Sequence, residues 1–161
     1  MAFPTRTSQA LIGLGSFAAV GFALYSQHHL GMQPCPWCIL QRIVFLAIGA
    51  VALLSALQPS GLLRRVLSLP VLALAGGGVA AAWWQHFVAA KTQSCALTFA
   101  DKVISFFGAD TRFPEVFEVR ASCADAAVNL LGVPYEFWSM ALLAVIGLLA
   151  LMGLLTRAPR R

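Results

Sequence analysis

The sequence predicts an all-α membrane protein, a bundle of four transmembrane helices with a long loop between the third and fourth. Three observations predict this fold. Of the 161 residues, 60% are hydrophobic and only 11% are charged, compared with about 25% charged residues in soluble domains. Four apolar runs are long enough to cross a bilayer, and arginines alternate with these runs. We therefore expect one integral membrane domain over residues 1–161.

The predicted spans are about 10–26, 39–57, 69–88 and 137–155. A backbone in hydrocarbon has no water to bond, so each run is predicted to be a helix. The first run is the shortest, and a cleaved signal peptide is the alternative for it. Its basic n-region is weak and no small-x-small pair follows the apolar stretch, so we predict that it is retained.

Arginines predict the topology of the bundle. They occupy the N-terminus, the segment between spans two and three, and the C-terminus: Arg6, Arg64, Arg65, Arg157, Arg160 and Arg161. By the positive-inside rule these segments, and both termini, are predicted to be cytoplasmic. Loops of about 27–38 and 89–136 then face outward. The net charge of +5 thus reflects topology and not a nucleic-acid site, which would gather its basic groups on one face.

Two residue patterns predict how the spans are placed and packed. Every Trp and Tyr lies at a predicted outer end of a span, where amphipathic rings favour the membrane interface: Tyr25, Trp37, Trp83, Trp84, Tyr135 and Trp138. In the third span Ala73, Gly77 and Ala81 recur every four residues. This spacing predicts a face of small residues packed closely against another helix.

The four cysteines carry the predicted chemistry. Cys35 and Cys38 form a Cys-Pro-Trp-Cys motif before span two, and Cys95 and Cys123 lie in the long outer loop. An extracytoplasmic compartment permits disulfides. The simplest pairing is Cys35–Cys38 with Cys95–Cys123, although four cysteines allow three connectivities. The short C-x-x-C ring restrains an unfolded chain little, which favours a redox pair; for Cys95–Cys123 a structural disulfide is the alternative. The spacing lacks a second C-x-x-C, so no metal site is predicted.

Arg42 lies four residues after Cys38 and on the same helix face. Cys38 is near the predicted N-terminus of the second helix, where unpaired N–H groups and the helix dipole stabilise a thiolate. An arginine inside a span is costly, and in one interpretation it snorkels to the lipid headgroups. In the interpretation that we favour, it stabilises the Cys38 thiolate and donates to the carbonyl of an electron acceptor.

Residues 97–107 of the outer loop include six large apolar residues close to Asp101, Lys102 and Asp110. Such a stretch predicts a short helix, lying either on the outer leaflet or as a cap packed on the bundle.

The segment Cys35-Pro-Trp-Cys38-Ile-Leu-Gln-Arg42 at the outer start of a span resembles the DsbB family of disulfide bond formation proteins. The later pair of cysteines and the segment Asn129-Leu-Leu-Gly-Val-Pro-Tyr-Glu-Phe-Trp138 extend the resemblance over nearly the whole chain. It implies a thiol oxidase of the bacterial inner membrane. Such a protein reoxidises a periplasmic DsbA-like oxidase of thioredoxin fold and passes the electrons to the membrane quinone pool, ubiquinone or menaquinone.

The resemblance also implies roles for individual residues. Cys95 forms the mixed disulfide with the reduced partner, and Cys123 is released as a thiolate. Exchange with the Cys35–Cys38 disulfide then regenerates the Cys95–Cys123 disulfide. Cys38 is the cysteine that faces the quinone, and Arg42 assists it.

His86 matches a family histidine near the quinone, one turn inside the outer end of span three. A helix-end histidine without a role is the alternative. The interval from His86 to Cys95 is shorter than in the best-known members of the family, and Gln41 of the motif receives no role.

Two other classes of protein compete with this interpretation. Vitamin K epoxide reductase-like proteins also couple a four-helix core and a C-x-x-C motif to quinones, but their loop cysteines precede the motif, whereas here they follow it. A non-enzymatic alternative is a membrane scaffold whose disulfides only brace its outer loops. A scaffold treated with a reduced partner would consume neither quinone nor oxygen.

Overall fold

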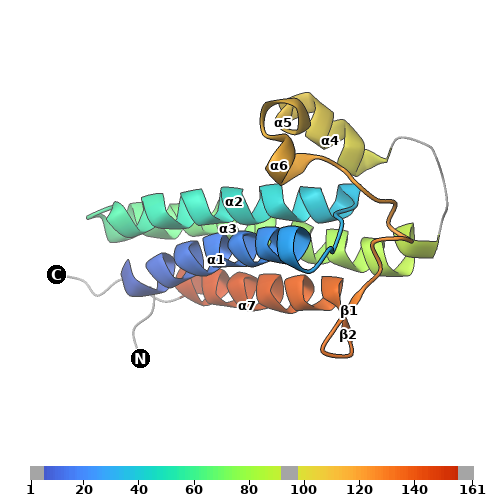
Figure 1. Cartoon of the computed structure of the whole chain (residues 1–161). Helices are drawn as coiled ribbons and strands as arrows, with labels where there is room; N and C mark the ends of the chain where they lie inside the picture. The colour runs from blue at the N-terminus through green and yellow to red at the C-terminus, as the bar shows by residue number, and fades with distance from the viewer. Residues whose placement is uncertain (1–5, 92–97, 156–161) are drawn as a thin grey trace.

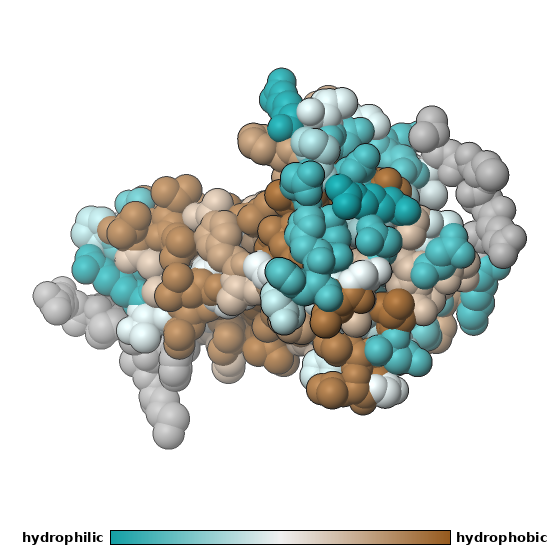
Figure 2. All heavy atoms as spheres, viewed as in Figure 1, coloured by the Kyte–Doolittle hydropathy of each residue, from teal (hydrophilic) through white to brown (hydrophobic). Residues whose placement is uncertain are grey.

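Four long helices form an elongated bundle in the computed structural model, which describes residues 6–91 and 98–155 (Figure 1). They are α1 (Arg6–His29), α2 (Pro36–Leu57), α3 (Gly61–Phe87) and α7 (Tyr135–Leu155). All four are long and apolar enough to cross a membrane. On the face shown in Figure 2, hydrophobic side chains cover the middle of the bundle and hydrophilic residues gather towards its ends. The predicted four-span, all-α membrane class is therefore confirmed.

All four helices begin earlier than their predicted spans, and the differences are largest for α1 and α3. α1 begins at Arg6, and α3 begins at Gly61, eight residues before the predicted position 69. Ser60 caps α3, since its hydroxyl accepts a hydrogen bond from the Leu63 N–H at 3.4 Å. The helix continues through Pro70. Arg64 and Arg65 shortened the apolar run in the sequence, but a helix can extend beyond the hydrocarbon, where its polar side chains are solvated.

Small residues of α3 do pack against other helices, but of the three predicted only Ala81 is buried. Ala73 and Gly77 are exposed on the outer surface, while Ala75 and Gly78 are buried. Leu143 of α7 is fully buried in the same core. Three consecutive glycines made the packed face ambiguous, and the four-residue pattern selected the wrong one. α3 thus contacts α7 through the face that contains Gly78.

Replacement of Gly78 by alanine is expected to destabilise the bundle. A Cβ there would lie 2.8 Å from Leu143 Cδ1 and 3.2 Å from Val44 Cγ1, and overpacking of a dense core costs about 1–3 kcal/mol. The matched control is Gly77→Ala, where a Cβ meets no atom within 4 Å. Thermal unfolding in detergent should show a lower midpoint for Gly78→Ala only. Equal midpoints for the two variants would contradict this packing.

The connection between α3 and α7 contains short elements. These are η1 (Ala89–Lys91), α4 (Phe99–Phe107), α5 (Ala109–Arg112), α6 (Pro114–Phe117), β1 (Asn129–Leu130) and β2 (Val133–Pro134). The two strands form an antiparallel hairpin that leads directly into α7. α4 contacts α2 and buries Ala100 and Ile104. Of the two predicted positions for this helix, the structure therefore has a cap packed on the bundle (Figure 1).

The two ends of the bundle differ in what they carry. The connection just described lies at one end, together with Cys35, Cys38 and Cys123; we call this the cysteine end. The first residues of α1, the last residues of α7 and the turn between α2 and α3 lie at the opposite end (Figure 1). The bundle thus separates the cysteines from Arg6 and Arg64, as the sequence predicts.

Candidate functional site at the cysteine end

The Cys-Pro-Trp-Cys motif forms the start of α2. Cys35 is the N-cap residue, with an extended backbone, and Cys38 lies in the first turn. The Cys38 N–H donates to Cys35 Sγ at 3.4 Å, and the two sulfurs are 3.0 Å apart. The two sulfurs are therefore adjacent, and a small movement brings them to the distance of about 2.05 Å that a disulfide bond requires. The predicted position of Cys38 at a helix N-terminus is confirmed.

Cys123 is brought to the same place from the long connection. The backbone N–H groups of Arg120 and Ala121 donate to the Pro34 carbonyl at 3.0 and 3.2 Å, which ties this stretch to the residue before Cys35. The side chains of Cys123 and Cys35 are hydrogen-bonded. Three of the four cysteines therefore form one cluster. Cys95 lies outside the described residues, so its predicted pairing with Cys123 stays a prediction.

The hydrogen bonds within this cluster shift the pKa values of Cys35 and Cys123, which lie outside the spans, in opposite directions. Cys35 is fully buried, and the hydrogen bonds that it donates to Cys123 and Cys38 raise its pKa well above the usual value, as does burial. Receiving the bond from Cys35 lowers the pKa of Cys123. Cys123 is therefore the better thiolate and leaving group, and Cys35 remains a protonated thiol.

Arg42 turns into the bundle and does not snorkel to the headgroups, because only 5% of it is exposed. Its Nη1 donates to Gln27 Oε1 and to the Val116 carbonyl, both at 2.7 Å. Its Nη2 donates to the Ala23 carbonyl at 3.5 Å. Arg42 thereby links α1, α2 and the segment at the end of α6. These acceptors are all neutral, so they leave the positive charge available to an anion beside it.

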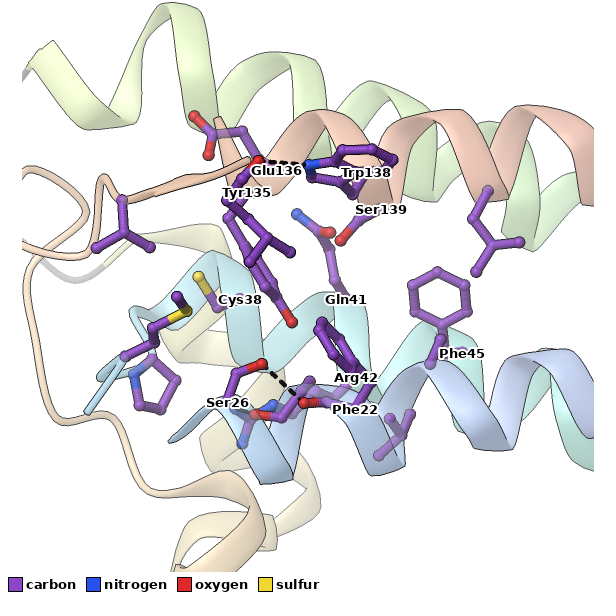
Figure 3. A pocket seen from close by; sticks show the side chains of 18 of the residues that line it. Phe22, Ser26, Cys38, Gln41, Arg42, Phe45, Tyr135, Glu136, Trp138 and Ser139 are labelled. Atoms are coloured by element: carbon purple, nitrogen blue, oxygen red, sulfur yellow. Dashed lines mark hydrogen bonds between the residues drawn. The ribbon is translucent and has the colours of Figure 1, made fainter. Parts of the chain in front are cut away.

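A cavity of about 640 Å³ lies between α1, α2, α7 and the hairpin (Figure 3). Its walls are mostly apolar, with Phe22, Phe45, Leu142 and Val145 among them. Polar side chains at the cysteine end also line it: Ser26, Cys38, Gln41, Arg42, Gln85 and Tyr135. Cys38 and Arg42 thus face one cavity, which agrees with their predicted placement on one face of the helix.

Two aromatic residues predicted for the membrane interface lie inside instead. Trp37 is only 8% exposed and packs in the apolar cluster around Cys35. Tyr135 points into the cavity towards Ser26, whose hydroxyl donates to the Phe22 carbonyl at 2.9 Å (Figure 3). Tyr25, by contrast, is 53% exposed. A position at the end of a span does not tell which way a ring points, so the sequence pattern could not separate these cases.

Two glutamines of the site were missed or left without a role by the sequence interpretation. Gln41 Nε2 donates to Gln85 Oε1 at 2.7 Å, and Gln85 Nε2 donates to Cys38 Sγ at 3.2 Å. Both side chains are 5% exposed. Their signal in the sequence is a polar residue within an apolar span, which is costly unless it has a partner.

His86 lies at the seam between α3 and α7. Its Nδ1 is 2.6 Å from Glu136 Oε1, and its ring contacts Phe87 and Phe137. Glu136 lines the cavity, but its carboxylate points away from it, towards α3 (Figure 3). Among the described residues, His86 is not part of the cavity wall. Its predicted role beside a cofactor stays a prediction.

Comparison with known proteins relates this arrangement to disulfide formation. The family model described as "Disulfide bond formation protein DsbB" matches residues 5–153. A "Disulfide bond formation protein B" of Ralstonia nicotianae is 32% identical, over 97% of this chain and 98% of the relative. The protein of that name from Aromatoleum aromaticum is 35% identical, over 94% and 93% of the two chains. The one from Polaromonas naphthalenivorans is 36% identical, over 91% and 89%.

Proposed function

Because the chain belongs to the DsbB family of disulfide bond formation proteins, we propose that it is a quinone-dependent thiol oxidase. Family membership itself gives a membrane protein that takes part in disulfide bond formation. The proposed reaction reoxidises a DsbA-like dithiol protein in the periplasm and transfers two electrons to ubiquinone or menaquinone. The proposed location is the bacterial inner membrane, with the cysteine end in the periplasm and the arginine-rich end in the cytoplasm.

The observation that carries the proposal is the shared cavity of Cys38 and Arg42 inside a membrane bundle. Its volume of about 640 Å³ lies within the range of small-molecule sites, roughly 300–1,000 Å³. Apolar walls with a few polar groups at one end suit an apolar ring that carries carbonyl oxygens. These features support a quinone as the occupant.

The residues present define what each would do for such an occupant. Arg42 would donate to a carbonyl oxygen and favour negative charge there, and Tyr135 would bound the same end of the cavity. Cys38 would present its sulfur as the electron donor. When bound, the quinone supplies a two-electron acceptor that takes up two protons. DsbA-type oxidants are known to have a potential near about −120 mV, so only a more oxidising acceptor completes the reaction.

The hydrogen bond between Cys35 and Cys123 supports thiol exchange between the two pairs. Cys35 is fully buried, so a protein partner cannot reach it and must react in the outer connection, at Cys95. The Cys123 thiolate released there would attack the Cys35–Cys38 disulfide at Cys35 and leave Cys38 reduced. The partner's second thiol would then displace Cys95 and leave the partner oxidised. The freed Cys95 thiolate would displace Cys35 from Cys123, so the Cys95–Cys123 disulfide is regenerated and Cys35 and Cys38 hold the two electrons as thiols.

Oxidation of a reduced DsbA-like protein by the purified chain, with defined ubiquinone or menaquinone analogues, tests the proposal. One quinol should form for each partner disulfide, followed by quinone absorbance and thiol titration. Oxidation of the partner without loss of quinone would contradict the assignment of the acceptor. If neither the partner's thiols nor the quinone are consumed, the scaffold alternative is favoured.

Replacement of Arg42 by methionine is expected to raise the KM for quinone by about tenfold, and the KM for the partner much less. The variant loses the charged donor, worth about 1.5–3 kcal/mol in a hydrogen bond, at the cavity and not at the partner's site. Steady-state kinetics with each substrate varied in turn measure both values. Arg64→Met is the matched control, because Arg64 lies at the opposite end, where Nη1 donates to the Gln58 carbonyl at 2.8 Å. Equal increases in both KM values for Arg42→Met would indicate general destabilisation instead.

A further inference from the structure

Cys38 Sγ accepts a hydrogen bond from a glutamine amide whose orientation is set by a second glutamine. Gln85 of α3 donates its Nε2 to the sulfur at 3.2 Å, and its Oε1 accepts from Gln41 Nε2 at 2.7 Å. Both glutamines are almost completely buried. Gln41 also lines the cavity beside Cys38 (Figure 3). The hydrogen bonds therefore connect Gln41 in the cavity wall to Gln85 of α3, and Gln85 to the Cys38 sulfur.

The direction of the Gln85 amide decides which form of the sulfur it stabilises. An amide has an NH₂ donor at one end and a carbonyl acceptor at the other. When Gln41 donates to the carbonyl oxygen of Gln85, only the NH₂ end remains for Cys38. An N–H directed at a sulfur favours the thiolate, whereas a carbonyl oxygen in that place would favour the thiol. Gln41 thus fixes the orientation that stabilises negative charge on Cys38.

We propose that Gln41 and Gln85 are positioning residues that hold an N–H donor on Cys38 and so keep its sulfur in the reactive thiolate form. The proposal deepens the proposed function, on which it rests for the identity of the molecule that the thiolate reduces. Neither glutamine reacts itself, and Gln85 acts directly on the sulfur while Gln41 acts through Gln85.

The competing explanation is that these glutamines only fasten α2 to α3. The two explanations differ in what they predict for the chemistry of the sulfur. Ionisable groups that face Cys38 are Arg42 on its own helix, Cys35, Cys123 in the long connection and Tyr135 on α7. All four are retained when a glutamine is replaced, so a change in the reactivity of Cys38 reports on the amide.

The test is the alkylation rate of Cys38 in the full-length reduced protein in detergent, with the modified cysteine identified by tandem mass spectrometry. Gln85→Met keeps the length of the side chain but removes the donor. We expect alkylation of Cys38 at neutral pH to slow by about tenfold, because the thiolate loses one hydrogen bond to a charged acceptor. At about pH 11, where thiols are ionised in either protein, the rates should be equal.

Gln9→Met is the matched control. Gln9 is 1% exposed and donates to Ser68 Oγ of α3 at 2.9 Å, so it also joins two helices through a buried amide. It lies at the opposite end of the bundle, and its replacement should lower the unfolding midpoint without changing the Cys38 rate. The measured quantity is the ratio of the Cys38 alkylation rate at neutral pH to the rate at alkaline pH. If this ratio is the same in Gln85→Met as in Gln9→Met, the proposal is wrong.

A double-mutant cycle tests the dependence of Gln85 on Gln41. Gln41→Met alone lets the Gln85 amide adopt both orientations, so the neutral rate should fall by less, about threefold. In the Gln85→Met background the same change should have no further effect, since no amide remains to be oriented. Independent, additive effects would overturn the role of Gln41.

This measurement involves neither quinone nor partner protein. The glutamine proposal fails if the alkylation rates do not respond, whatever the oxidase assay gives. The proposed function fails if the unmutated protein reduces no quinone, even when the alkylation rates respond as expected. The two failures are therefore distinguishable.

Discussion

Replacement of Cys38 by serine is expected to abolish quinone reduction, lowering the turnover rate by more than about a thousandfold. Cys38 is the only cysteine among those described whose side chain lines the cavity. A serine hydroxyl neither donates electrons nor forms a disulfide with Cys35, so electrons reach the outer cysteines and stop. Quinone absorbance should stay constant when reduced partner is added.

The same variant should still oxidise its partner once. Cys95 and Cys123 are untouched, so about one partner dithiol per protein molecule is oxidised in a rapid burst, measured by quenched thiol titration. The burst shows that the variant is folded and that partner exchange is intact. Continued quinone reduction by Cys38→Ser would contradict the role given to this sulfur.

Replacement of Cys123 by alanine is expected to trap a mixed disulfide between Cys95 and the partner. The Cys95 thiol of this variant opens the disulfide of an oxidised DsbA-like protein, and the bond remains between the two chains because the neighbouring thiol is missing. Without Cys123 no outer thiol contacts Cys35, so the mixed disulfide cannot be resolved by exchange with the Cys35–Cys38 pair. The adduct should change from a trace in the unmutated protein to a major band on non-reducing gels after acid quenching.

A variant that lacks both Cys95 and Cys123 is the control for this experiment and should give no adduct. If Cys123→Ala gives no adduct either, while the unmutated protein turns over under the same conditions, the roles of the two outer cysteines are wrong. An adduct that maps to Cys35 would contradict the complete burial of this side chain, and one that maps to Cys38 would contradict the role given to Cys95.

The sequence predicted the four-helix class because hydropathy reports directly on burial in lipid. It did not predict where α3 begins, because Arg64 and Arg65 interrupt an apolar run but not a helix. Of the three small residues that it placed on the packed face of α3, only Ala81 is buried. Which face of an all-apolar helix contacts protein and which contacts lipid depends on the neighbouring helices, and a single sequence does not contain that information.

The site was predictable to the extent that its residues lie close together in the chain. The spacing of Cys38 and Arg42 placed both on one helix face, and the structure puts both on one cavity. Gln85 and Tyr135 come from other helices, and only the packing of α3 on α2 and of α7 on α3 brings them to Cys38. Buried amides of this kind are ordinary polar residues in a sequence until the fold shows what they contact.

The cavity opens sideways between α1 and α7. Phe22 on α1 and Val145 on α7 line it and are also 47% and 51% exposed on the outside of the membrane-spanning helices. Its mouth thus faces acyl chains, so a molecule dissolved among them arrives without crossing water. Binding of such a molecule depends on its mole fraction in the lipid or detergent, not on its concentration in the total volume. Adding empty micelles at fixed total acceptor should therefore slow turnover by surface dilution.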